Sequence, residues 1–188
     1  MKLDERLQLL GIDALLRPVK VMILSDCRVP LPEGPLQAKK GDEVEVPRWI
    51  AEVLVSQGLA KYKEEVNVNY VNMYHYKERR STTGSQLAQL PPDFYVSVGE
   101  FIRSLEEEIK RSPSHMLIND KDMSEKNIIE LSETRLSKII RLAQTDMGDE
   151  EVPKMTPEEA LVYSQLKTTV SAWKKYIESL MGSQASPP

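Results

Sequence analysis

The pattern of apolar and polar positions changes near Glu65 and divides the chain into two parts. Between Arg17 and Glu65, short apolar runs and alternating positions are typical of β-strands. From Val66 onward, apolar residues recur every three or four positions, which is the spacing of one face of an α-helix. The pattern therefore predicts an α+β protein, with a small β-rich domain over 17–65 followed by an all-helical domain, a helix bundle, over 66–182.

The two ends of the chain fall outside these domains. Residues 1–16 place leucines near a helical spacing, and a short docking helix or a mobile arm would both fit that pattern. Residues 183–188 are rich in serine and proline, so we expect a disordered tail there.

Two strands and an intervening loop are predicted in the first part. The segment 19–24 is apolar and partly β-branched, as a buried strand should be. Val44 and Val46 alternate with glutamates, which indicates a half-buried strand. Proline fixes φ and cannot donate to a sheet, so the three prolines between these strands predict a loop. They are Pro30, Pro32 and Pro35.

A helix and a last short strand complete the β-rich domain. Pro47 suits the first position of a helix from Arg48 to Gln57, and Gly58 suits its C-terminal stop. The segment 59–62 then reads as a strand. The predicted buried positions of the helix are Ile50, Ala51, Val53 and Leu54. A unit of this size is near the lower limit for independent stability, so we expect it to need a neighbour.

The second part contains four predicted helices. One spans 66–80, and a polar loop follows at 81–86. Asp93 is the expected N-cap of the next helix, which ends at Ser112 and Pro113. His115, beside this stop, reads as loop.

The last two helices carry the strongest patterns. The helix over 123–145 has two apolar stripes, and a helix that is apolar on two sides sits centrally in a bundle or faces another chain. Its first stripe contains Ile128, Leu131, Arg135, Ile139 and Leu142, and its second contains Ile129, Leu136, Ile140 and Ala143. The final helix starts at a capping box formed by Thr156 and Glu159, with Pro157 at the first helical position.

Composition and charge narrow the class of protein. The net charge is −4, from 25 basic and 29 acidic residues, and neither part is basic. Autonomous nucleic-acid binding through phosphate contacts is therefore not indicated. No apolar run approaches the roughly 20 residues of a membrane span. The N-terminus has no secretory signal pattern, so we expect a cytoplasmic protein with no membrane contact.

Candidate chemistry is sparse. One cysteine, Cys27, excludes an internal disulfide, and two histidines leave no credible zinc set. His75 lies between two tyrosines and reads as a surface or helix-packing residue. The acidic run 106–108 is typical of a solvated helix face. We therefore expect no catalytic residue, no cofactor site and no metal site; an enzyme would need an unexpected pocket with perturbed ionisable groups.

Two groups of basic residues have alternative interpretations. Lys77, Arg79 and Arg80 follow two tyrosines, so they resemble a small nucleic-acid patch, but a basic helix end that complements the macrodipole is the simpler interpretation. A second group recurs every three residues in the 123–145 helix, and we expect it to pair with acids of an adjoining helix or subunit. That group is Arg135, Lys138 and Arg141.

Four segments together resemble the GINS family of archaeal and eukaryotic replication proteins, which combine a helical A domain with a β-rich B domain. "KKGDEVEVPRWIAEVLVSQGLAK" is similar to a B-domain stretch of turn, strand, proline and helix. "LPPDFYVSVGEFIRSLEEEI" resembles the Asp-Phe-Tyr helix entry of an A domain, "TRLSKIIRLAQ" its Arg-x-x-Lys-Ile helix, and "MTPEEALVYSQL" its final helix start. The order of B before A resembles the archaeal subunit of the Psf-two and Psf-three type.

The resemblance implies a non-catalytic scaffold in DNA replication. GINS proteins form a tetramer, here a homotetramer or a heterotetramer, that joins the MCM helicase and a RecJ-like partner and stimulates unwinding at the fork. Contact with DNA would be indirect or weak, and the protein would be associated with the nucleoid of an archaeon. The candidate contacts to DNA or to a partner are Lys77, Arg79 and Arg80. The expected subunit interface comprises Ile129, Leu136, Ile140, Leu166, Val170 and Trp173.

An independent nucleic-acid-binding or regulatory module is the alternative. It would use the β-rich domain as a winged or barrel-like reader, and it predicts salt-sensitive DNA binding by the isolated chain. The acidic balance of the sequence favours the scaffold.

Overall fold

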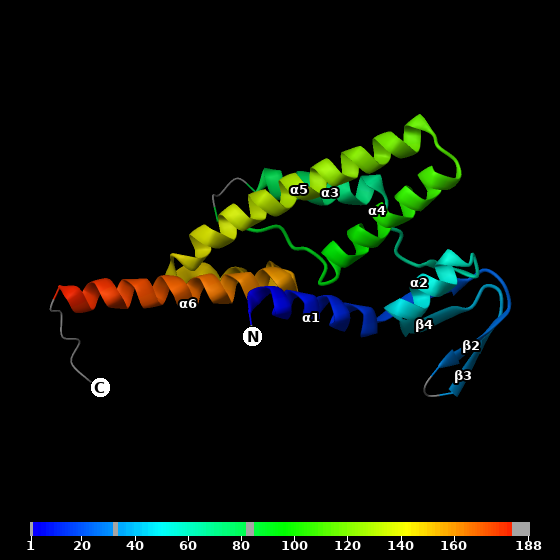
Figure 1. Cartoon of the computed structure of the whole chain (residues 1–188), viewed down its shortest axis with the longest axis horizontal. Helices are drawn as coiled ribbons and strands as arrows, with labels where there is room; N and C mark the ends of the chain where they lie inside the picture. Colours follow the sequence, from blue (N-terminus) through cyan, green and yellow to red (C-terminus); the bar gives the residue numbers. More distant parts are fainter. Residues whose placement is uncertain (1, 32–33, 82–84, 182–188) are drawn as a thin grey trace. The chain divides into compact units, whose positions relative to one another are not determined.

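The computed structural model describes residues 2–31, 34–81 and 85–181, and the chain divides into two compact units between Val66 and Asn67 (Figure 1). The first unit contains a small antiparallel sheet and the second is a bundle of helices. The predicted fold class, a β-rich domain followed by a helix bundle, is therefore confirmed.

The first unit is built on a three-stranded antiparallel sheet in the order β4-β1-β5. The central strand is β1 (Pro18–Ile23), with β4 (Glu43–Pro47) on one side and β5 (Ala60–Tyr62) on the other. The register sets Val21 opposite Val44 and Tyr62. Alternation along β1 turns Val21 and Ile23 into the core, as expected for a strand with one buried face.

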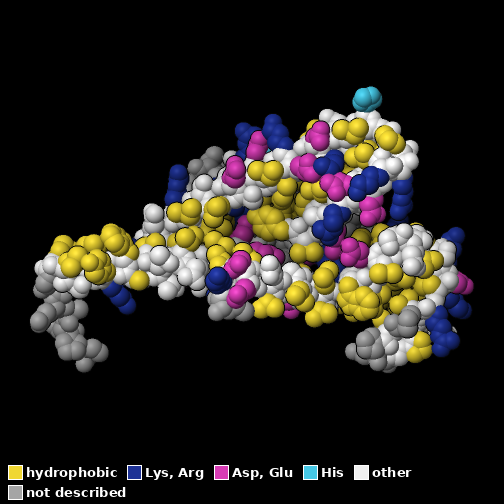
Figure 2. Space-filling model, viewed as in Figure 1, with side chains coloured by type: hydrophobic (Ala, Val, Ile, Leu, Met, Phe, Trp, Pro, Cys, Tyr) yellow, Lys and Arg dark blue, Asp and Glu magenta, His cyan; other side chains and the backbone are white. Residues whose placement is uncertain are grey.

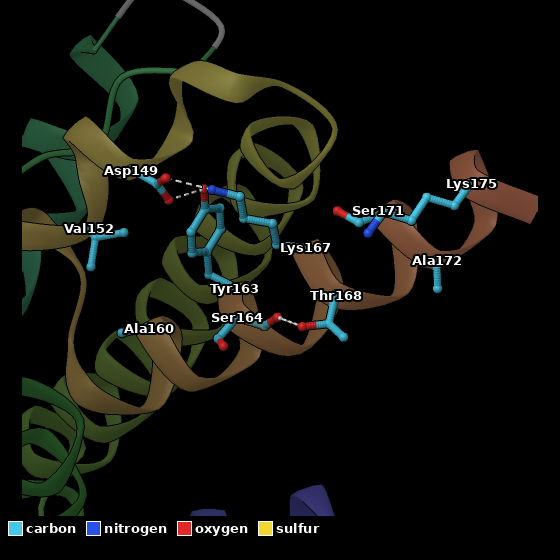
Figure 3. Close-up of a pocket in the computed structure, with 10 residues that line it drawn as sticks. All are labelled: Asp149, Val152, Ala160, Tyr163, Ser164, Lys167, Thr168, Ser171, Ala172 and Lys175. Carbon is cyan, nitrogen blue, oxygen red and sulfur yellow. Dashed lines mark hydrogen bonds and ion pairs between the residues drawn. The ribbon is translucent and has the colours of Figure 1, made fainter. Parts of the chain in front are cut away.

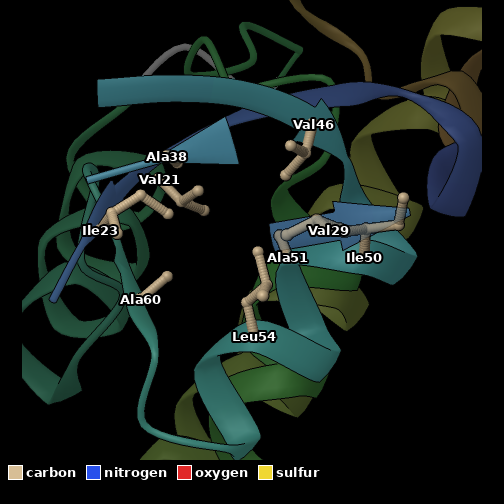
Figure 4. Packing of buried hydrophobic residues seen from close by; sticks show 9 residues of the cluster. All are labelled: Val21, Ile23, Val29, Ala38, Val46, Ile50, Ala51, Leu54 and Ala60. Atoms are coloured by element: carbon tan, nitrogen blue, oxygen red, sulfur yellow. The ribbon is translucent and has the colours of Figure 1, made fainter. Parts of the chain in front are cut away.

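Helix α2 (Arg48–Ser56) covers the buried face of this sheet (Figure 4). Its inward positions Ile50, Ala51 and Leu54 meet the buried strand residues in one apolar cluster. The cluster consists of Val21, Ile23, Val29, Ala38, Val46, Ile50, Ala51, Leu54 and Ala60. The prediction that Val53 is buried is wrong, because the helix turns that side chain outward and leaves it 47% exposed.

The ends of α2 differ in how well local sequence predicted them. Pro47 is the N-cap and the last residue of β4 rather than the first helical position, because its ψ of 141° is still extended. Gly58 follows the C-cap and has a φ of +71°, a left-handed conformation that favours glycine. The predicted helix stop at Gly58 is therefore confirmed.

The predicted proline loop is instead a hairpin. Strands β2 (Cys27–Leu31) and β3 (Gly34–Ala38) pair antiparallel, with Pro30 directly opposite Pro35. In a two-stranded sheet both strands are edges, so a residue without an N–H fits wherever that N–H would point away from the partner. Val29 and Ala38 join the core of the unit, and this burial holds the hairpin on the sheet. Pro32 lies outside the described residues.

The N-terminal segment is helix α1 (Leu3–Leu16), which closes the first unit. Ala14 is its buried residue, and α1 contacts α2. Its apolar side chains Leu9, Ile12 and Leu16 are at least half exposed.

The second unit is arranged around one long helix, α5 (His115–Ala143). Against α5 pack α3 (Val68–Arg80), α4 (Phe94–Arg111) and α6 (Pro157–Leu180), and the 3-10 segment η1 (Asp146–Lys154) connects α5 to α6 (Figure 1). A helix with neighbours on several sides needs more than one apolar stripe.

The long helix starts eight residues earlier than the pattern predicted, so the loop assigned to His115 is wrong. Ser114 is the N-cap, and its Oγ accepts a hydrogen bond from the Leu117 amide at 3.2 Å. The first two turns are mostly polar and exposed, so apolar periodicity does not reveal them.

The two stripes of α5 differ in solvent exposure. Leu131, Arg135, Ile139 and Leu142 of the first stripe are buried, while Ile129, Leu136 and Ile140 of the second are 40–55% exposed. Ala143, assigned to the second stripe, is buried beside Tyr163 in the core of the unit. Ala143 is buried, unlike the other three residues of its stripe, because it lies at the end of α5, where α6 passes close by.

Aromatic rings fix α3 against the start of α4. Phe94 is fully buried, and its ring centroid lies 5.9 Å from that of Tyr70 and 5.1 Å from that of Tyr74. Asp93 precedes α4 as the predicted N-cap residue, with its carboxylate accepting from the Ser97 hydroxyl at 3.2 Å.

Of the predicted loop 81–86, positions 82–84 lie outside the described residues, as do 183–188 of the predicted tail.

Candidate functional site

A buried cluster of charges lies at the centre of the helical unit and fixes its helices. Arg135 of α5 lies between Glu78 of α3 and Glu159 of α6, and the side chains of Arg135 and Glu78 have no solvent exposure. Its Nε and Nη2 donate to the two carboxylate oxygens of Glu159 at 2.6 and 2.7 Å, and Nη1 donates to Glu78 at 2.7 Å. Because the guanidinium is planar and forked, it can bind a carboxylate in this bidentate manner.

The guanidinium of Arg135 has all of its hydrogen-bonding capacity used. Nη1 also donates to the Ala88 carbonyl at 2.8 Å, and Nη2 to the Lys154 carbonyl at 3.1 Å. With the three bonds to glutamates, every N–H of the group has an acceptor. Such complete satisfaction allows a charge to remain buried, since an unpaired buried donor would be costly.

Lys138 completes the cluster one turn further along α5. Its Nζ donates to the Glu78 carboxylate at 2.5 Å and to the Gln86 carbonyl at 2.9 Å. Two cations and two carboxylates therefore balance each other in the interior. The prediction that Arg135 and Lys138 pair with acids of adjoining helices is confirmed, whereas Arg141 lies on the exposed side of α5.

The electrostatics of the cluster follow from this balance. Burial lowers the pKa of Arg135, but the hydrogen bonds and charges of Glu159 and Glu78 outweigh it, and the net shift is upward. Burial raises the pKa of Tyr95, and the neighbouring Glu159, which accepts a hydrogen bond from its hydroxyl at 2.7 Å, raises that pKa further. Arg135 therefore stays charged and Tyr95 stays neutral.

The same cluster determines where α6 begins. Thr156 and Glu159 form the predicted capping box: the Thr156 Oγ1 accepts from the Glu159 amide at 3.4 Å, and Glu159 accepts from the Thr156 amide at 3.0 Å. Glu159 thus caps α6 and binds Arg135 with one carboxylate. The direction in which α6 leaves the bundle is tied to α5 through this residue.

The far half of α6 carries an exposed apolar surface (Figure 2). Trp173, Tyr176 and Leu180 are 57–65% exposed, and Figure 2 shows apolar side chains gathered at the end of this helix. Val170 is half-buried, and Leu166 packs in part against the core of its own unit. Contiguous exposed apolar side chains of this kind often mark a surface that binds another protein.

The predicted DNA or partner contacts lie together at the end of α3. Lys77, Arg79 and Arg80 are exposed. The Nζ of Lys77 lies 5.0 Å from the ring centroid of Tyr74, and the guanidinium of Arg80 lies 5.5 Å from that of Tyr76. The structure brings these basic side chains together with their aromatic neighbours at one end of the helix.

A shallow pocket lies where η1 meets α6 (Figure 3). Asp149 accepts from Tyr163 at 3.0 Å and from Lys167 at 2.5 Å. The hydrogen bond from Lys167, followed by that from Tyr163, lowers the pKa of Asp149. The exposed side of the pocket is lined by small and hydroxyl-bearing residues of α6 such as Ser164, and Asp149 and Lys167 already pair with each other.

The remaining candidate residues show no catalytic arrangement. His75 Nε2 lies 3.2 Å from the Glu130 carboxylate on α5, so this histidine packs between helices as expected. Cys27 begins β2. Over residues 2–31, 34–81 and 85–181, no three metal-binding side chains gather, and no helix has the length and apolarity to cross a membrane.

Sequence reasoning found Arg135 and Lys138 but missed the carboxylate that they share, Glu78. Glu78 stands within a basic, polar helix end and carries no apolar signal of burial. Its contact with Arg135 spans 57 positions of sequence, so only the packing of α3 against α5 reveals it.

The second unit is thus a helix bundle that is held together by a buried charge cluster and that carries exposed apolar helix faces. Residues 65–178 match the family Sld5, described as the GINS complex protein helical bundle domain. That match covers more than half of the sequence, so the chain belongs to the GINS family and is a GINS complex subunit in DNA replication, with other GINS subunits as its partners. A comparison with curated proteins found no match.

Proposed function

We propose that this chain is a non-catalytic scaffold that bridges the MCM helicase and a RecJ-like partner within a tetrameric GINS complex and stimulates unwinding at the fork. The proposal extends to an archaeal subunit of the Psf-two and Psf-three type, in a homotetramer or heterotetramer, associated with the nucleoid. The domain order of β-rich unit before helical bundle supports this type.

The exposed far half of α6 is the observation that carries the scaffold role. A lone bundle would turn Trp173 and Leu180 inward, yet they are 62% and 65% exposed. Ile129, Leu136 and Ile140 on α5 add a second exposed apolar face. Both faces fit burial against other subunits, because removing such side chains from water favours association.

The first experiment measures assembly directly. Light scattering of the purified chain at micromolar concentration should give a mass well above the 21.4 kDa of one chain, and a stable monomer would overturn the proposal. Trp173→Asp should reduce the assembled fraction. Ser171→Asp, an exposed polar position two residues away on the same helix, is the matched control and should leave assembly unchanged.

The second experiment tests the replication partners. Co-purification of the tagged chain from native extract, with mass spectrometry, should recover MCM and RecJ-like proteins, and addition of the assembled complex should raise the unwinding rate of MCM. Their consistent absence would contradict the bridging role. Salt-sensitive DNA binding by the chain alone, lost on changing Lys77, Arg79 and Arg80 together, would place weak DNA contact at the end of α3.

A further inference from the structure

Strand β4 has one edge that no other strand covers. Its inner edge pairs with β1, and α2 is the one other element of the described chain that packs closely on it. Strands β2 and β3 pair with each other in a separate sheet. The other outer strand of the three-stranded sheet, β5, is only three residues long. The outer edge of β4 is therefore the longest row of main-chain groups on this sheet that a further strand could bind.

The register of β4 on β1 determines which main-chain groups point outward. The Ile23 amide donates to the Asp42 carbonyl at 2.9 Å. Bonded pairs alternate with non-bonded pairs in an antiparallel ladder, so Val44 bonds to β1 while Glu43 and Glu45 turn their N–H and C=O groups away from it. Neither of these two amides has an acceptor among the residues that the structure describes.

The second sheet of the unit shows how an edge can be closed. In the β2–β3 hairpin, Pro30 lies opposite Pro35. Opposite residues in an antiparallel pair exchange two hydrogen bonds or none, and proline has no N–H, so the ring nitrogens of this pair lie on the two outer edges. Each outer edge of the hairpin therefore lacks a donor at that position. On β4 the proline is Pro47, the last residue, and the two outward amides before it stay available.

The side chains of β4 define what a further strand would meet. Glu43 and Glu45 are exposed on the outer face of the sheet, whereas Val46 is buried and points into the core (Figure 4). Lys63 binds Glu43 at 2.6 Å, and Lys20 of β1 lies opposite Glu45, so both bases come from the inner side of β4. Because cross-strand pairs of opposite charge stabilise a sheet, a strand on the outer side fits best with basic residues opposite the two glutamates.

We propose that the outer edge of β4 binds an extended segment of a partner protein in which basic and apolar residues alternate. The segment continues the sheet by bonding to the main chain of Glu43 and Glu45, with its basic side chains beside the two carboxylates and its apolar ones beside Val44. A second copy of β4 does not fit, because any register that uses both outward amides sets a glutamate opposite a glutamate. This surface lies in the first unit and does not depend on the assembly proposed above.

Titration of the full chain, followed by nuclear magnetic resonance, tests the site with a blocked peptide of alternating lysine and valine as the probe. We expect saturable binding that shifts the amide resonances of Glu43 and Glu45 and slows their exchange with solvent, because both amides gain acceptors. A peptide with the same residues sorted into one lysine run and one valine run has the same charge. It should bind at least about tenfold more weakly, since it loses several cross-strand pairs.

Variants separate the main-chain contribution from the charge. Glu45→Pro removes an outward N–H and a carboxylate but no bond to β1, and it should weaken binding at least about fivefold. Glu45→Gln keeps the N–H and should weaken binding less. Glu52→Gln makes the same charge change at an exposed position of α2, so it is the matched control and should leave binding unchanged.

Three outcomes overturn the proposal. They are equal binding of the two peptides, unchanged exchange of the Glu43 and Glu45 amides when the alternating peptide is added, and full binding by Glu45→Pro. The exchange measurement uses the parent chain, so it decides the question even if Glu45→Pro does not fold. Shifts of these amides that grow with protein concentration in the absence of peptide would show that a second copy occupies the edge instead.

Discussion

Arg135 and Glu159 form a bidentate ion pair that joins the middle of α5 to the first turn of α6, with N–O distances of 2.6 and 2.7 Å. Arg135 has no solvent exposure and the Glu159 side chain has 8%. The pair couples helix capping to helix packing, because the same carboxylate also closes the capping box with Thr156. Loss of either residue should therefore affect both α5 and α6.

Removing Arg135 should strongly destabilise the helical unit. Arg135→Met leaves Glu78 and Glu159 buried without their main cation, so we expect the free energy of unfolding to fall by about 3–5 kcal/mol. Urea denaturation followed by circular dichroism measures this change. Arg79→Met, at an exposed position of α3, is the control and should stay within about 0.5 kcal/mol of the parent. Equal stability of the two variants would contradict the role of the cluster.

Truncating the cap of α6 should have a smaller effect. Thr156→Ala removes the acceptor of the Glu159 amide, and we expect a loss of about 1 kcal/mol in unfolding free energy. Thr156→Ser keeps a hydroxyl and should retain most of the stability. Thermal unfolding of both variants would show whether the hydroxyl or the β-branched shape matters, and a Ser variant as unstable as the Ala variant would exclude the capping role.

Gly148 should not tolerate a side chain. A Cβ there would lie 2.7 Å from the Leu142 carbonyl oxygen and would also collide with the Tyr163 hydroxyl. Since the carbonyl belongs to the end of α5, Gly148→Ala should cost about 1–3 kcal/mol in unfolding free energy. Gly99→Ala is the control: its Cβ would meet Arg103 Nη1 at an ordinary 3.6 Å, and alanine favours the helix. The double variant Gly148→Ala, Tyr163→Phe should recover part of the loss.

The contact of Asp149 with Lys167 and Tyr163 predicts a pH dependence of stability. Hydrogen bonds from Lys167 and Tyr163 lower the pKa of Asp149 below its ordinary 3.8, so the folded state favours the ionised form. This stabilisation is present above pH 3.8 and is lost as the pH falls through the lowered pKa of the folded protein. The difference in melting temperature between the parent and Asp149→Asn should therefore shrink below pH 3.8, and a constant difference down to pH 2 would contradict the prediction.

The positions of the helix ends that depend on local chemistry could be predicted from the sequence. Thr156, Pro157 and Glu159 specify the start of α6 within one turn, and Gly58 specifies the end of α2 through its positive φ. The start of α5 at Ser114 could not be found from apolar spacing, because the turns that follow it are mostly polar. Its serine cap was the one available signal.

Periodicity alone determined that this chain has a β-rich part followed by helices, and that the 123–145 segment is apolar on two sides. The tertiary structure decided which apolar positions are buried: it covered Ala143 and exposed Val53. It also paired Pro30 with Pro35 in a hairpin and gave Arg135 its partners on α3 and α6. The physical reason is the sequence distance over which each kind of interaction acts. Capping and helical spacing act within a few residues, whereas burial and ion pairing depend on segments that only the folded chain brings together.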